Sequence, residues 1–197
     1  MICLITPTGS VRGTRDESTA IFYDTRRLRP LEAGQFWLSD TPTVIGSRTW
    51  GNHTIRMATW ARFADNRTGV KFVVFDTQPR QRVGTVPHTH CRTAPRPDQR
   101  RRGEPVVVLI GDFNAPATTS APYNILTSGA GLTDTWIAAA HRRTPQYSTV
   151  HGFGPPIPRG ARIDWVFTRA PCTVSAAAID TTRSSWKCCR DGGCRLR

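Results

Sequence analysis

Residues 105–114, Pro-Val-Val-Val-Leu-Ile-Gly-Asp-Phe-Asn, constrain the fold of this chain more than any other stretch. The Val-Val-Val-Leu-Ile run is continuous and rich in β-branched side chains, which is typical of a strand buried on both faces. The run stops at Gly111 and is followed at once by Asp112 and Asn114. Because side chains alternate along an extended chain, these two polar groups are expected on the same side. The stretch therefore predicts a polar site at the open end of a central strand.

The same residues allow a second interpretation. Gly111 and Asp112 can form a turn, with Asn114 capping the next segment, because these residue types are favoured in turns. The local pattern by itself leaves both interpretations open.

Elsewhere the chain shows the periodicity of short strands and short helices. Strands are predicted over residues 20–23, 55–63, 70–77 and 163–168. A turn at 65–69 joins two of them into a hairpin, a further turn is expected at 24–28, and a long loop at 34–50. Helices are predicted near 121–128 and 134–140. Strands outnumber helices, which favours an α+β fold over a doubly wound sheet.

Four stretches together resemble a known family. They are Asp16-Glu17-Ser-Thr-Ala-Ile-Phe-Tyr23, Gly34-Gln-Phe-Trp-Leu-Ser39 with Arg56-Met-Ala-Thr-Trp60, Gly111-Asp-Phe-Asn-Ala115, and Arg162-Ile-Asp-Trp-Val-Phe167. Their order and spacing are similar to those of the endonuclease/exonuclease/phosphatase superfamily, the metal-dependent phosphoesterases related to DNase I. The resemblance covers roughly residues 15–183. It implies an α+β fold, an incomplete DNase I-like two-sheet β-sandwich flanked by helices, with the site at one end of the sandwich.

The resemblance also implies roles for five residues. Asp112 would orient or deprotonate the attacking water, and Asn114 would hydrogen-bond the scissile phosphate. Asp164 matches an Asp that holds a catalytic His near the C-terminus, and Arg56 matches an Arg that contacts the substrate phosphate. Glu17 matches a carboxylate that supports the family's first catalytic His.

Each of these assignments has a plainer alternative. Asp164 could form a salt bridge to Arg162 or to a neighbouring arginine, because a lone carboxylate inside an apolar strand is costly. Arg56 could be a solvated arginine at a sheet edge. The partner that Glu17 would support is Gln78 in this chain, and an amide cannot act as a general acid. His151, in a Gly- and Pro-rich loop, could reach the mouth of the site, although loop histidines are more often solvated.

The implied cofactor is Mg²⁺ or Mn²⁺, because hard oxygen ligands suit these ions. The family's metal-ligating Glu would lie upstream of Met1, so the metal ligands of this chain are unknown from its sequence. The family's closing Ser-Asp-His is also not found, since Ser184 is followed by Ser-Trp-Lys-Cys-Cys. We therefore expect weak metal binding and near-background hydrolysis of phosphate esters. Lengthening the chain and restoring these motifs should recover metal-dependent hydrolysis.

Residues 78–103 depart from the family pattern. They hold seven Arg, four Pro and a single acid, without helical or strand periodicity. The family has a Thr-His-Leu-Asp motif and an amphipathic helix here. Read one base later, codons for residues 79 onward can spell such a helix, so we hypothesise a frameshift near Gln78 that is corrected near Gly103. The alternative is a genuine basic loop, and sequencing the gene would decide between them.

The net charge of +13 allows a different class of function. A strongly basic chain can bind nucleic acid without catalysis, which is the alternative to a phosphoesterase domain. A third interpretation is the unstable product of a decayed gene. The substrate itself, whether nucleic acid or another phosphate ester, cannot be read from these residues.

The remaining expectations concern organisation. We expect a partial domain over residues 1–183, with 78–103 irregular, and a basic, disordered tail over 184–197. Cys188-Cys189 and Cys194 lack the spacing of a structural zinc site. No apolar run is long enough to span a membrane and no signal peptide is recognisable. A monomer located in the cytoplasm is expected.

Overall fold

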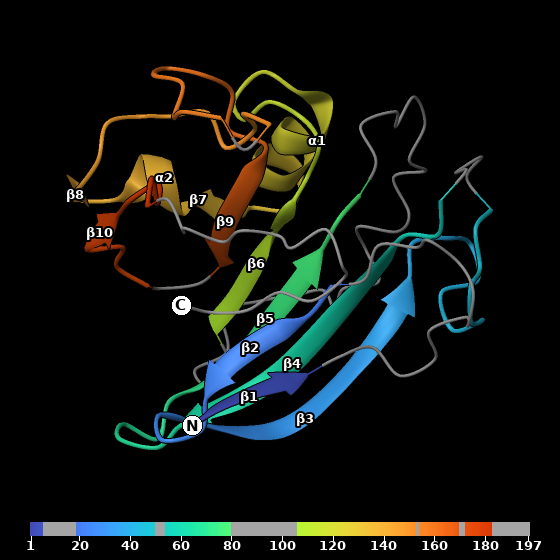
Figure 1. The fold of residues 1–197 in the computed structure, drawn as a ribbon. Helices are drawn as coiled ribbons and strands as arrows, with labels where there is room; N and C mark the ends of the chain where they lie inside the picture. The colour runs from blue at the N-terminus through green and yellow to red at the C-terminus, as the bar shows by residue number, and fades with distance from the viewer. Residues whose placement is uncertain (6–18, 50–53, 80–105, 153, 170–171, 183–197) are drawn as a thin grey trace, which may run out of the picture.

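The computed structural model describes residues 1–5, 19–49, 54–79, 106–152, 154–169 and 172–182. Its main element is a six-stranded sheet with strand order β3-β4-β5-β6-β9-β7 (Figure 1). The strands of this sheet are β3 (Leu28–Trp37), β4 (Met57–Asp65), β5 (Lys71–Thr77), β6 (Val106–Asp112), β7 (Thr133–Asp134) and β9 (Asp164–Arg169). Neighbouring strands are antiparallel except β5 and β6, which are parallel.

Two small sheets accompany the main one. An antiparallel ribbon is formed by β1 (Ile2–Ile5) and β2 (Ile21–Asp24). A parallel pair is formed by β8 (His141–Arg142) and β10 (Ala176–Ala177). The helical segments are short: α1 (Ala121–Asn124), which continues as a π-helical turn over Ile125–Gly129, and α2 (Thr135–Ala138).

The β1–β2 ribbon packs against one face of the main sheet. Ile21 of β2 is buried together with Ala61 and Phe63 of β4, and Phe72 and Val74 of β5 pack against this cluster. The ring of Phe63 lies 5.0 Å from that of Tyr23 on β2. Two sheets thus enclose an apolar core, as the family resemblance implied for an incomplete sandwich.

A second core lies on the opposite face of the main sheet. Trp165 and Phe167 of β9 are almost fully buried there against Phe113 and Tyr123, with Phe113 and Trp165 stacked at 4.3 Å. The register shows why the two cores lie on opposite faces. Leu109, which packs on the second core, is opposite Phe167 of β9. Val74, which packs on the first core, is opposite Val108, the residue directly before Leu109. Alternation along each strand separates them.

The predicted strands and helices are present, with shifted bounds. The loop expected at 34–50 is wrong over its first part, because β3 continues to Trp37 and pairs with β4 as far as Trp37 opposite Met57. Gly34 permits this pairing, since a Cβ there would lie 2.8 Å from the indole Nε1 of Trp60. The second predicted helix is shorter, because Ala139 is already extended at ψ 128°.

The predicted central strand is confirmed as central, lying between β5 and β9. It runs to Asp112 rather than stopping at Gly111, and its residues are half-buried rather than buried. Gly111 is required by close approach: a Cβ there would lie 1.9 Å from the carbonyl oxygen of Thr77 on β5. Of the described helices, none is long and apolar enough to cross a membrane.

Candidate functional site at the end of the sandwich

A cavity of about 600 Å³ opens on the face of the main sheet that also carries the β1–β2 ribbon. Sheet register explains which side chains face it. Asp112 is opposite Asp164, and Ile110, two residues earlier on β6, is opposite both Asp76 and Val166. These five residues share one face because side chains alternate along each strand, and all five line the cavity. The sheet therefore places three carboxylates along one wall of the cavity.

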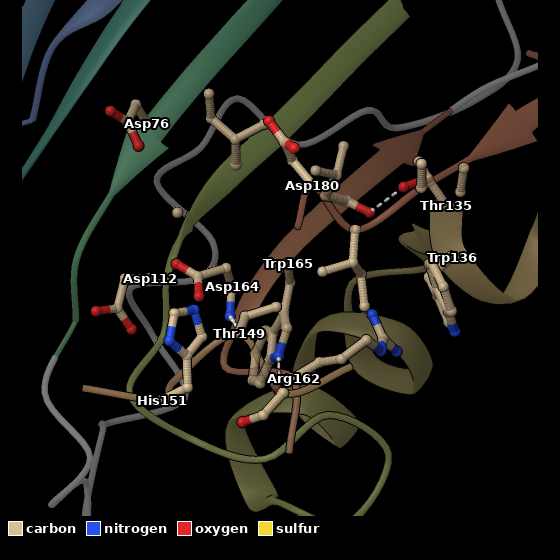
Figure 2. A pocket seen from close by; sticks show the side chains of 17 residues that line it. Asp76, Asp112, Thr135, Trp136, Thr149, His151, Arg162, Asp164, Trp165 and Asp180 are labelled. Carbon is tan, nitrogen blue, oxygen red and sulfur yellow. Dashed lines mark hydrogen bonds between the residues drawn. The ribbon is translucent and has the colours of Figure 1, made fainter. Parts of the chain in front are cut away.

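Other walls of the cavity come from loops and from the C-terminal part of the described chain. They include Thr135 and Trp136 of α2, the segment containing Ser148, Thr149 and His151, and residues 177–180, which end in Asp180 (Figure 2). Asp180 is a fourth carboxylate in the wall, and its pKa is lowered by hydrogen bonds from the side chain and backbone of Thr182.

Asp112 is held by its neighbours at the end of β6. Its Oδ1 accepts a hydrogen bond from the backbone N–H of Asn114 at 2.8 Å, and its Oδ2 accepts one from the side-chain amide of Gln78 at 3.5 Å. Gly111 keeps β6 close to β5 at this point. The Gln78 amide can orient the Asp112 carboxylate, but it has no proton that it could release at neutral pH.

Asp164 faces Asp112 from the first residue of β9. Desolvation by the surrounding protein raises the pKa of Asp164, the negative charge of Asp112 raises it further, and a hydrogen bond involving Thr149 opposes both effects. Burial likewise raises the pKa of Asp76. A cavity with several carboxylates and raised pKa values is an arrangement found at sites of proton transfer and cation binding.

The alternative salt bridge between Asp164 and Arg162 is wrong. Asp164 is exposed at the cavity wall, whereas Arg162 is buried and its Nη2 lies 2.8 Å from Oδ2 of Asp134. The same Asp134 oxygen accepts a hydrogen bond from the hydroxyl of Tyr123 at 2.9 Å. Burial, followed by this hydrogen bond to Asp134, raises the pKa of Tyr123 to about 12. The exposure of Asp164 removes the need for a buried partner.

Asn114 and Arg56 do not line this cavity among the described residues. The alternation argument stops applying at Asp112, because Asn114 lies beyond the strand in a left-handed conformation (φ 51°). Its side-chain amide donates to the carbonyl of Pro79 at 3.2 Å. Arg56 directly precedes β4, and its carbonyl accepts the N–H of Leu38. Glu17 lies outside the described residues, as does most of the segment 78–103.

Sequence reasoning passed over Asp76, Asp180 and the buried pair of Asp134 and Arg162. A signal for Asp76 was present, because it is an acid in the apolar run Phe-Val-Val-Phe-Asp-Thr, the same pattern that drew attention to Asp164. Asp134 could have been recognised as a helix N-cap, since its side chain accepts the N–H of Trp136. Asp180 carried no local signal.

A divalent metal ion was expected from the resemblance, and the described residues do not complete a site for it. Among them, no group of three or more His, Cys, Asp or Glu side chains is arranged to hold a metal ion. The carboxylates of the cavity are the hard oxygen donors that Mg²⁺ prefers, but that ion needs more ligands than one facing pair supplies. No chemical step is therefore derived through a metal ion.

Comparison with known proteins finds similar solved structures but no similar family model or curated sequence. A mannosyl-6-phosphatase of Bacteroides thetaiotaomicron is 22% identical with a TM-score of 0.72, covering 92% of this chain and 67% of that one.

Two further matches are described as endonuclease/exonuclease/phosphatase family proteins. The one from Bacteroides thetaiotaomicron is 21% identical with a TM-score of 0.73, over 98% of this chain and 70% of that one. The one from Bacteroides vulgatus is 24% identical with a TM-score of 0.71, over 90% and 68%. The chain thus spans about two thirds of the length of these proteins. It has the fold of the endonuclease/exonuclease/phosphatase superfamily, as its four motifs predicted.

Proposed function

We propose that this chain is a phosphoesterase domain that hydrolyses a phosphate ester by direct attack of water. The observation that carries the proposal is the pairing of Asp112 with Asp164 across β6 and β9 at the floor of the cavity. Water bound between such carboxylates can lose a proton to one of them as it attacks phosphorus. The shared fold of phosphatases and other family members supports this reaction class.

Asp112 is the base of the proposed reaction. Its carboxylate is oriented by the N–H of Asn114 and the amide of Gln78, which leaves it facing the cavity. Asp164 supplies a second negative charge that helps to align the water, and Asn114 and Arg56 are proposed phosphate contacts that require the substrate to reach beyond the cavity wall. Glu17 is proposed as a supporting carboxylate.

The proposed cofactor is Mg²⁺ or Mn²⁺, weakly bound. Its chemistry would be to neutralise the phosphoryl oxygens, which four cavity carboxylates otherwise repel. Because the described residues do not complete a metal site, we expect a slow enzyme, below about 1 s⁻¹. A monomeric state and a cytoplasmic location stay predictions.

Hydrolysis of p-nitrophenyl phosphate and bis(p-nitrophenyl) phosphate by the full chain, with Mg²⁺ or with EDTA, tests the proposal. Asp112→Ala should reduce the rate to that of buffer, because the base and the orientation of the water are lost together. Asp24→Ala is the matched control, since Asp24 is a carboxylate on β2 that pairs with Arg26 and does not line the cavity. Equal rates in the wild type and Asp112→Ala would refute the proposal.

A second candidate is a non-catalytic protein that binds nucleic acid, which the net charge of +13 favours. Binding of this kind weakens steeply with added salt because phosphate contacts release counterions. DNA binding that is lost in high salt, unaffected by Asp112→Ala and accompanied by no ester hydrolysis would support this candidate instead. The four carboxylates of the cavity would repel a phosphate backbone, so the binding surface would lie elsewhere.

A further inference from the structure

The cavity contains one imidazole among its described lining residues, that of His151. In Figure 2 this ring lies by the carboxyl groups of Asp112 and Asp164 and points into the space next to them. Of the side chains that occur in proteins, histidine has the unperturbed pKa closest to neutral, about 6.5, so it can both give and accept a proton. The proposed reaction needs such a group, because Gln78 has no acidic proton.

The loop that carries His151 is fixed to the strand that carries Asp164. The hydroxyl oxygen of Thr149 accepts the N–H of Ile163 at 2.9 Å and that of Asp164 at 3.1 Å. The N–H of Thr149 in turn donates to the carbonyl of Ala161 at 3.1 Å. Thr149, two residues before His151, therefore makes three hydrogen bonds to the segment that leads into β9.

The loop is also closed beyond His151. The N–H of Gly154 donates to the carbonyl of His151 at 3.0 Å, and Gly152 adopts φ 57°, a conformation that other residues rarely adopt. On the other side, the hydroxyl of Ser148 can donate to the carbonyl oxygen of Val150, at 2.7 Å, or to that of Ala161, at 3.0 Å. The backbone of His151 is thus held on both sides, while its side chain is exposed and free to meet a substrate.

We propose that His151 is the general acid of the phosphoesterase reaction, an inference that rests on the proposed function. Water attacks phosphorus and its proton passes to the Asp112 carboxylate. As the bond between phosphorus and the leaving oxygen breaks, the protonated imidazole of His151 donates its proton to that oxygen, which leaves as an alcohol. The products are an alcohol and a phosphate, and the proton on Asp112 returns to His151 through solvent.

The dependence of the rate on the leaving group tests this assignment. Phenyl phosphate has a leaving oxygen that needs a proton, whereas p-nitrophenolate leaves without one because the nitro group delocalises its charge. His151→Gln should slow hydrolysis of phenyl phosphate by roughly 100-fold, or to the buffer rate, and that of p-nitrophenyl phosphate by less than about tenfold. His141→Gln is the control, because His141 is exposed on β8 and does not line the cavity.

The outcomes separate the two proposals. If the wild type hydrolyses neither ester, the proposed function fails and the role of His151 fails with it. If the wild type is active and His151→Gln slows both esters equally, or neither, only the role of His151 is wrong. Equal slowing would indicate a structural effect of the substitution.

Nuclear magnetic resonance gives a readout that does not depend on turnover. With Mg²⁺ present, inorganic phosphate should shift the imidazole Cε1–H signal of His151 in a saturable way and leave that of His141 unchanged. The spectrum of His151→Gln identifies the signal by its loss. A His151 signal that does not respond to phosphate would overturn the assignment, since the proton donor must contact the phosphate ester.

Discussion

Two charged clusters lie on either side of the start of β9, and they differ in almost every respect. Arg162 and Asp134 are both buried, carry opposite charges and meet at 2.8 Å. Asp164, two residues after Arg162, carries the same charge as Asp112, its partner in register on the neighbouring strand β6. In the first cluster each charge is paired with its opposite, whereas the second places two like charges together. The pKa of Asp164 is raised by desolvation first and by the charge of Asp112 second.

The difference indicates which cluster holds the fold together and which serves chemistry. Asp134 accepts hydrogen bonds from Arg162, from the hydroxyl of Tyr123 and from the N–H of Trp136, so its carboxylate is fully used. The guanidinium groups of Arg162 and Arg142 lie 5.5 Å and 5.4 Å from the centre of the Trp136 ring. A carboxylate engaged in this way has no capacity for substrate, whereas Asp112 and Asp164 face an open cavity.

Removing the buried charge should have the largest effect on stability. Asp134→Ala leaves the guanidinium of Arg162 buried without its carboxylate, and we expect a loss of about 3–5 kcal/mol in the free energy of unfolding. Urea denaturation followed by tryptophan fluorescence would measure it. The exposed pair of Asp24 and Arg26 is the control, because Asp24→Ala should leave the denaturation midpoint almost unchanged. A small effect of Asp134→Ala would remove the contrast between the clusters.

A smaller loss is expected where β5 and β6 approach most closely. Gly111→Ala places a Cβ against the carbonyl oxygen of Thr77, which forces the strand ends apart, and we expect a cost of about 1–3 kcal/mol. Gly129→Ala is the matched control, because a Cβ at that position meets no atom within 4 Å. If both substitutions have the same denaturation midpoint, the ends of β5 and β6 are not held together as described.

The smallest effect should come from the facing carboxylates. Because the pKa of Asp164 is raised in the folded state, the contribution of this group to stability is present below pH 3.8 and is lost as pH rises through its folded value. Asp164→Asn should therefore be slightly more stable than the wild type at pH 7, and this difference should vanish near pH 3. Denaturation at both pH values measures it. A variant less stable than the wild type at pH 7 would mean that Asp164 makes a favourable contact.

Some of the site could be predicted from the sequence because its signals are local. The apolar run before Asp112 predicts a strand, and the motif Arg162-Ile-Asp-Trp-Val-Phe167 predicts another over 163–168; the structure has them as β6 and β9. The polar end of the central strand followed from these patterns. The reading of Asp164 as a carboxylate inside an apolar strand was wrong, because the strand begins at that residue and leaves its side chain exposed.

Other parts depend on contacts between residues far apart in the chain. Asp76 joins the site only because β5 pairs in parallel with β6, across a connection of about thirty residues whose local pattern encodes no partner. His151 joins it because Thr149 binds backbone groups of Ile163 and Asp164, a contact that spans 14 and 15 residues.

The sequence by itself determined strands β2, β4, β5, β6 and β9, the α+β class and the position of Asp112 at the end of its strand, because alternation and β-branched runs act over a few residues. The tertiary structure decided which charges meet. It paired Arg162 with Asp134 rather than with Asp164, since burial of a guanidinium requires a carboxylate within reach and only folding determines which one that is.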